Sequence, residues 1–134
     1  MLLTEVATFL ASNVTDTALT AGTNLFASKL PNDPDVAVAV YELTSGPPEY
    51  VHGGDGGPWA ERPRLQCYVR HTNYADGRDL ANDVWRKLQT IANQDLSGVR
   101  YHRCQAVTSV NFLRFDELDR PVFTMNMSIW KAPS

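Results

Sequence analysis

Residues 53–57 read Gly-Gly-Asp-Gly-Gly, and this run is the first feature of the sequence that could do chemistry. Clustered backbone N–H groups in such a run can bind a phosphate, above all at the start of a helix. A nucleotide-binding loop continues into Lys-Ser or Lys-Thr, which do not follow here, and the next strong helical pattern begins about twenty residues later. We therefore interpret the run as part of a connection and predict no cofactor site.

Two pairs of cysteine and histidine could supply metal ligands, namely Cys67 with His71 and His102 with Cys104. Zinc sites usually hold such pairs about two to four residues apart on tight turns. Four residues of extended strand span about 13 Å, so Cys67 and His71 cannot bind one ion together. We predict no metal site and two free, buried thiols; a disulfide would require the two cysteine strands to be neighbours.

Nucleophilic catalysis needs a Ser or Cys beside a His and an orienting carboxylate. The chain has three histidines, but it has no Gly-x-Ser-x-Gly elbow and no catalytic signature around either cysteine. The acidic pairs Asp33/Asp35 and Asp116/Asp119 fall in predicted turns, where carboxylates usually serve as solvated turn formers. We therefore predict no catalytic residue and infer that the protein is not an enzyme.

Length and composition indicate what kind of molecule must carry these residues. The chain has 134 residues, 43% hydrophobic and 20% charged, with a net charge of −3, so we expect one globular domain over residues 1–134. The twelve Lys and Arg are scattered, which disfavours a tight grip on nucleic acid but suits a passive pore around DNA. Neither a membrane-spanning run nor the basic start of a signal peptide is present, so we expect assembly in the cytoplasm and no membrane partner.

Hydrophobic periodicity predicts the secondary structure. Helical spacing covers residues 2–13 and 76–93, and strand signals cover residues 24–30, 36–43, 64–72, 99–113 with a break near residue 109, and 121–130. Residues 116–119 read as a hairpin turn. We predict an α+β fold: a mostly antiparallel sheet of four to five strands, two helices packed on one face, and a long Gly/Pro-rich loop. The expected core is Leu3, Val6, Leu10, Val38, Val40, Leu80, Val84, Leu88, Phe123, Met125 and Ile129.

Two of the predicted strands have features that favour contact with other chains. Residues 36–43 are apolar on both faces, which indicates either a strand covered on both sides or one whose outer face meets a partner. The interior of residues 121–130 contains no charge or proline. If that strand lay at a sheet edge, nothing would prevent it from pairing with another chain.

Residues 44–63 are the least regular part of the sequence and read as a long loop or arm. They contain five Gly and four Pro, with Tyr50 and Trp59 among them and Arg62 near their end. Such composition cannot hold a β-ladder or a helix, so we predict a long loop. Large aromatic rings in this setting suit contact with a partner surface, so Tyr50, Trp59 and Arg62 are the candidate partner contacts. The alternative is that the loop folds back and both rings cover the edge of the domain.

Four stretches of the sequence carry a resemblance to a known family. They are MLLTEVATFLAS, TAGTNLFASKLPNDPDVAVAVYELTSGPP, RPRLQCYVRHTNYADGRDLANDVWRKLQTI and HRCQAVTSVNFLRFDELDRPVFTMNMSIW. In layout the chain resembles the tail terminator, or minor capsid (head–tail joining), proteins of long-tailed bacteriophages. The passage from LFASKLP through two prolines into VAVAVYE is the most telling part.

This resemblance implies a structural protein of the virion, in its tail or neck, assembled in the host cytoplasm. It implies a homo-oligomeric ring, a hexamer, at the head-proximal end of the tail tube, where the ring stops tube growth and provides the head–tail joining surface. Its partners would be the tail tube protein and the head connector or stopper protein, and DNA would pass through without specific binding. The resemblance implies no cofactor and no catalytic residue. The alternatives are another head–tail connector component, such as a stopper, or, from a different class, a small soluble enzyme or ligand-binding domain.

Overall fold

The computed structural model describes residues 1–50 and 59–133. Within them the chain forms α1 (Leu2–Asn13), β1 (Leu25–Ala27), β2 (Ala37–Thr44), β3 (Pro48–Glu49), β4 (Ala60–Glu61), β5 (Arg64–Arg70), α2 (Tyr74–Leu88), β6 (Ala92–Leu96), β7 (Val99–Ala106), β8 (Asn111–Phe115) and β9 (Pro121–Lys131). Both predicted helices, the five predicted strand regions, the break near residue 109 and the turn at residues 116–119 are confirmed.

Strand β9 is the central strand of the sheet. Along one side it pairs antiparallel with β5, and β4 extends that side as far as Lys131. Along the other side it pairs first with β8 and then with β7. The hypothesis that residues 121–130 form a sheet edge is therefore wrong: in the described part of the chain the strands with one neighbour are β1, β3, β6 and β8.

The α+β class is confirmed, but the sheet is larger than predicted. The described residues form a mixed sheet of nine strands, not four to five, in which β1 and β2 pair in parallel and the other pairs are antiparallel. The missed strands β3 and β4 have two residues each, and β6 has the polar sequence Ala-Asn-Gln-Asp-Leu. Strands this short or this polar give no hydrophobic alternation to detect.

Helix α2 is shorter than predicted at its end and begins slightly earlier. It begins at Tyr74, where the Asn73 side chain accepts a hydrogen bond from the Asp76 N–H and caps the first turn. It ends at Leu88, and Asn93 then adopts a left-handed φ of 48°, which a continuing helix excludes. Ile91 lies after the end of the helix and is buried. Its spacing from Leu88 therefore predicted burial correctly but helix wrongly.

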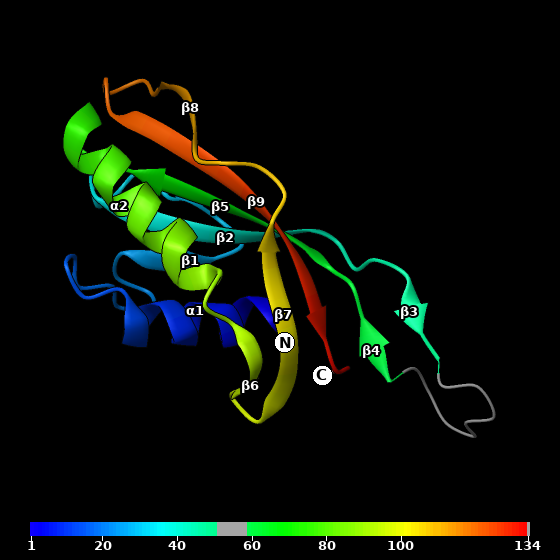
Figure 1. Cartoon of the computed structure of the whole chain (residues 1–134). Helices are drawn as coiled ribbons and strands as arrows, with labels where there is room; N and C mark the ends of the chain where they lie inside the picture. The colour runs from blue at the N-terminus through cyan, green and yellow to red at the C-terminus, as the bar shows by residue number, and fades with distance from the viewer. Residues whose placement is uncertain (51–58, 134) are drawn as a thin grey trace.

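Both helices pack on the same face of the sheet, as predicted (Figure 1). All eleven predicted core residues are buried there, and so are Cys67 and Cys104, which are free cysteines. Residues 37–40 of β2 are buried on both faces, so the first of the two alternatives for that strand holds. No helix in residues 1–50 or 59–133 is long and apolar enough to cross a membrane.

A buried carboxylate connects helix α1 to the sheet. Glu5 is 4% exposed, and its Oε1 accepts a hydrogen bond of 2.7 Å from the Tyr101 hydroxyl of β7. Its Oε2 lies 2.7 Å from the Met1 ammonium group. Burial by itself raises the pKa of Glu5, but these two hydrogen bonds, with the positive charge of Lys131, outweigh it and lower the pKa below its usual value. The carboxylate is thus charged in the folded protein and fixes the position of α1.

Two buried arginines hold the turn at residues 31–35 against the sheet. Arg70 donates from Nη1 to the Pro31 carbonyl at 2.6 Å, and it also reaches the carbonyls of Pro34 and Asp35. Arg120 donates to the Asn32 carbonyl at 2.6 Å. These bonds satisfy both guanidinium groups inside the protein and join the start of β2 to the end of β5 and the start of β9.

We predict that Leu88→Ala lowers the free energy of unfolding by about 2–5 kcal/mol, because Leu88 is fully buried and its truncation leaves a cavity. Leu43→Ala is the matched control, since Leu43 is 50% exposed and its loss leaves no cavity. Urea denaturation measures both values. Equal effects of the two substitutions would show that the α2 face is not the core.

We predict that the free energy of unfolding falls as the pH drops below about 4.3, the usual pKa of a glutamate. Because the folded pKa of Glu5 is lowered, its contribution is complete above the unfolded pKa and is lost as the pH falls through the folded pKa. Tyr101→Phe removes one donor, costs about 1–3 kcal/mol at neutral pH and weakens this acid dependence.

Urea denaturation at a series of pH values provides the measurement. Tyr68→Phe is the control, because the Tyr68 hydroxyl makes no hydrogen bond within the described residues and Tyr68 lies on the other face of the sheet. An unchanged acid dependence in Tyr101→Phe would contradict the role given to this bond.

Candidate assembly surface

We call residues 44–63 the arm; its described parts, residues 44–50 and 59–63, extend from the sheet and include two short strands (Figure 1). Strands β3 and β4 pair antiparallel, and the Trp59 N–H donates to the Glu49 carbonyl at 2.8 Å. The prediction that this composition cannot hold a β-ladder is therefore wrong for the base of the arm. A ladder this short needs only two residues on each side, and its one proline, Pro48, is the first residue of β3, a position that tolerates proline. The Gly-rich run at residues 53–57 lies outside the described residues.

Gly46 holds the base of the arm close to the sheet. Its φ is 69°, in the left-handed region that favours glycine, and a Cβ there would overlap the carbonyl oxygen of Arg62. Ala60, which pairs with Glu49 on the facing strand, is fully buried. The first and last residues of the arm are thus packed together, so the arm leaves the sheet from a fixed position.

Three rings from distant parts of the chain meet where the arm joins the sheet, and we call Trp59, His102 and Trp130, with Arg62, the aromatic cluster. The ring centroids of His102 and Trp130 are 4.7 Å apart, and Trp59 lies 5.4 Å from His102 and 5.6 Å from Trp130. The Arg62 guanidinium lies 4.9 Å from the Trp130 ring centre and also hydrogen-bonds Glu49. Such contacts hold the rings in place.

The three candidate contact residues are thus not in one environment. The structure brings Trp59 and Arg62 together over β9, and Trp59 is 39% exposed, so the alternative of a ring that covers the edge of the domain applies in part to Trp59. Tyr50 is 65% exposed and makes no ring contact within the described residues. Tyr50 therefore offers a free ring, whereas Trp59 offers one face of a rigid cluster.

Sequence reasoning considered His102 only as a metal ligand and did not place His102 or Trp130 beside Trp59. Both lie on the sheet face opposite the helices, because their neighbours Tyr101, Ile129 and Lys131 are buried on the helix side. Trp130 Nε1 and His102 Nε2 are buried without a hydrogen-bond partner in the described part of the chain. Only the pairing of β7 with β9 could have revealed this site, and single-strand alternation contains no pairing information.

The described residues offer nothing suited to chemical catalysis. Cys67 and Cys104 are buried, and burial raises the pKa of Cys67 and raises that of Cys104 to about 12, so neither thiol is a thiolate at neutral pH. No group of three or more His, Cys, Asp or Glu side chains converges in the part of the chain that is described. An arm with a rigid aromatic base and an exposed tyrosine can bind another protein surface.

The sequence identifies the family. The chain belongs to the family described as bacteriophage tail terminator protein, which matches residues 11–131. It is therefore a non-enzymatic structural protein of the phage virion, located in the tail or neck, where it contacts other phage structural proteins. The resemblance seen in the sequence is confirmed.

Solved structures support the fold. A chain from the virion of a native gene transfer agent particle has a TM-score of 0.57 at 15% sequence identity, over 92% of this chain and 84% of that one. A second solved chain, with a TM-score of 0.47 and 14% identity over 98% of this chain and 94% of its own length, is too distant to support an argument. A search of curated protein sequences found no significant match.

We predict that Gly46→Ala costs more stability than Gly98→Ala. Both glycines have positive φ, so each alanine costs about 1–2 kcal/mol for a left-handed conformation. Around Gly98 nothing lies within 4 Å, whereas at Gly46 the Arg62 backbone must also move. Urea denaturation gives the stability difference, and proteolysis within residues 44–63 shows whether the arm is released. Equal costs and equal cleavage would mean that the close approach at Gly46 does not hold the arm.

Proposed function

We propose that copies of this protein form a ring, a hexamer by the resemblance, on the head-proximal end of the tail tube. The ring stops tube growth and provides the surface that joins the tail to the head connector or stopper protein. The observation that carries this proposal is the match to the tail terminator family over residues 11–131, from within α1 to the end of β9. We propose that residues 1–134 form a single tail-terminator-like domain, and the length of the family match supports this.

We propose further that DNA passes through the ring without specific binding. The net charge is −3, and a surface that neutralises phosphates needs a row of free basic groups. Two of the arginines, Arg70 and Arg120, are buried and bonded to the turn at residues 31–35, which leaves them unable to reach a phosphate. A wall that does not attract the backbone lets the duplex slide.

The arm is the proposed contact with the tube or the head connector. Tyr50 supplies an exposed ring, and Trp59 and Arg62 supply a rigid edge that loses little conformational entropy on binding.

We predict that Tyr50→Ala, Trp59→Ala and Arg62→Ala weaken binding to tail tubes by about tenfold or more if the arm supplies the main anchors, with the fold intact. Purified variants are mixed with the tail tube protein, and electron microscopy scores the tube ends and tube lengths. Val107→Ala is the control for loss of an exposed apolar side chain, because Val107 is 43% exposed but follows β7, outside the arm.

Rings at one end of tubes of limited length support the proposal. Bare ends on tubes of unrestricted length, with the unmodified protein present in excess, refute tube capping. Full capping by all three arm variants would leave tube capping in place and refute the role of the arm.

A further inference from the structure

We propose that neighbouring copies in the ring join by a contact in which Leu118 and Phe115 of one copy enter the recess between α1 and β1 of the next. We call the first surface the hairpin edge, formed by β8 and residues 116–119, and the second the α1–β1 recess. The inference rests on the proposed ring, and it names the two surfaces that close it.

The hairpin edge exposes four large apolar side chains. Every residue of β8 is exposed, and the large apolar side chains there are Phe112 at 38%, Leu113 at 41%, Phe115 at 54% and Leu118 at 65% exposure. Strand β8 pairs only with β9, so its other edge is open. An open edge with large apolar side chains and a single arginine is a surface that proteins cover with a partner.

Leu118 is held out by a rigid turn. The Asp116 Oδ1 accepts hydrogen bonds from the N–H groups of Leu118 at 3.0 Å and Arg120 at 2.9 Å. Arg120 in turn donates from Nε to Asp116 Oδ2 at 2.8 Å, and it is buried against the turn at residues 31–35. Leu118 is 65% exposed, so most of its side chain is open to contact. An apolar side chain on a preorganised turn loses little entropy on binding, as expected of an anchor.

The α1–β1 recess has a volume of about 490 Å³, within the usual range for binding clefts, and lies at the opposite edge of the sheet. Figure 1 shows β8 along one edge and β1 and α1 along the other. Most of the surface that lines the recess is apolar, and it comes from α1 and from the residues around β1: Thr4, Ala7, Thr8, Ala21, Gly22, Leu25, Phe26, Ala27, Lys29 and Pro31.

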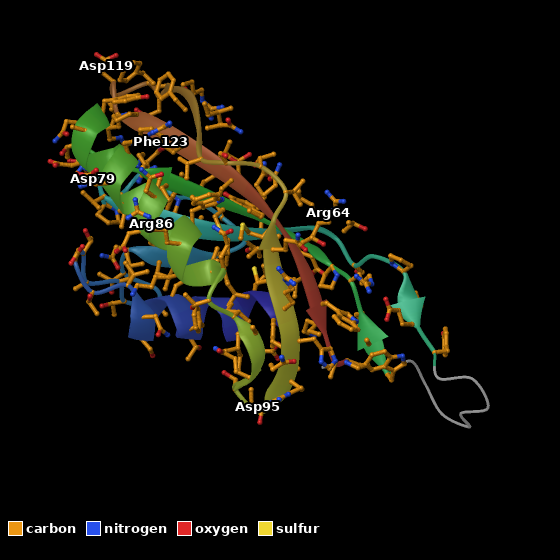
Figure 2. The ribbon with its side chains drawn as sticks, viewed as in Figure 1. Arg64, Asp79, Arg86, Asp95, Asp119 and Phe123 are labelled. Atoms are coloured by element: carbon orange, nitrogen blue, oxygen red, sulfur yellow. The ribbon has the colours of Figure 1, made fainter. Side chains whose placement is uncertain are left out.

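Charge and geometry indicate that the occupant is a second copy of this chain. Lys29 lines the recess, and Glu117 and Asp119 flank Leu118; none of the three makes an ion pair within the described residues. Figure 2 shows Asp119 at the far end of the hairpin. Donor and receptor therefore lie on one chain at two different edges. Contacts of this head-to-tail kind form closed rings when the rotation permits.

Cysteine cross-linking tests the contact. Copies with Leu118→Cys are mixed with copies with Ala27→Cys, with tail tubes present, and a mild oxidant is added. Both positions are exposed, so both variants should fold, and the native thiols are buried. We expect a disulfide dimer only when both variants are present. When one chain carries both substitutions, we expect a series of cross-linked oligomers (a ladder) up to the number of copies in the ring. Val107→Cys replaces Leu118→Cys in the control, because Val107 is exposed but follows β7, outside both proposed surfaces.

A dimer with Leu118→Cys alone would mean a symmetric contact, and no dimer at all would mean no contact; either result overturns the inference. Capped tubes without cross-links overturn this contact and leave the proposed function in place. Ladders without capped tubes support the contact and refute the proposed function.

A charge swap provides a second readout in the same cysteine pair. Lys29→Glu in the recess is expected to lower the yield of cross-linked dimer roughly twofold to fivefold, as expected for an exposed ion pair. Glu117→Lys on the hairpin edge should then restore the yield. A yield that neither substitution changes, or one that the second lowers further, contradicts the pairing of these charges.

Discussion

The rest of the structure depends on the pairing of strand β9 on both sides. Its backbone hydrogen-bonds β5 and β4 along one side and β8 and β7 along the other, so strands from four parts of the chain must align with one register. A slip of one residue would turn Phe123, Met125 and Met127 away from the helices. An uncharged strand interior suits this central position, and it has no need of protection against other chains.

Buried charged groups at the periphery of the sheet fix two segments that strand pairing does not hold, namely α1 and the turn before β2. Glu5 and Tyr101 fix α1 across 96 residues of sequence, and Arg70 and Arg120 fix the turn before β2. Such groups are stable inside a protein only when they are hydrogen-bonded, and each of them is. As a result, α1 and the turn at residues 31–35 are held in fixed positions against the sheet. Rigid surfaces suit a protein that works by fitting to others.

The surfaces proposed for contact divide between two regions of the molecule. The aromatic cluster and Tyr50 lie at the arm, which leaves the sheet near the end of β9, whereas the hairpin edge lies at its beginning. We propose that the arm meets the tube or the connector and that the two sheet edges meet neighbouring copies. A ring protein needs this separation, because each copy must bind its neighbours and the tube at once.

The sequence by itself determined the helices, the long strands and the core, because side-chain periods of about 3.6 and 2 are local properties. The lack of a catalytic motif could also be read directly from the order of the residues. It also pointed to Trp59 and Arg62, from the unusual setting of their segment. It could not place β9 at the centre, pair β3 with β4, or bring His102 and Trp130 beneath Trp59, since each depends on contacts between residues far apart in the chain. Only the tertiary structure decided these, because strand pairing is set by which register buries the most apolar surface across the whole sheet.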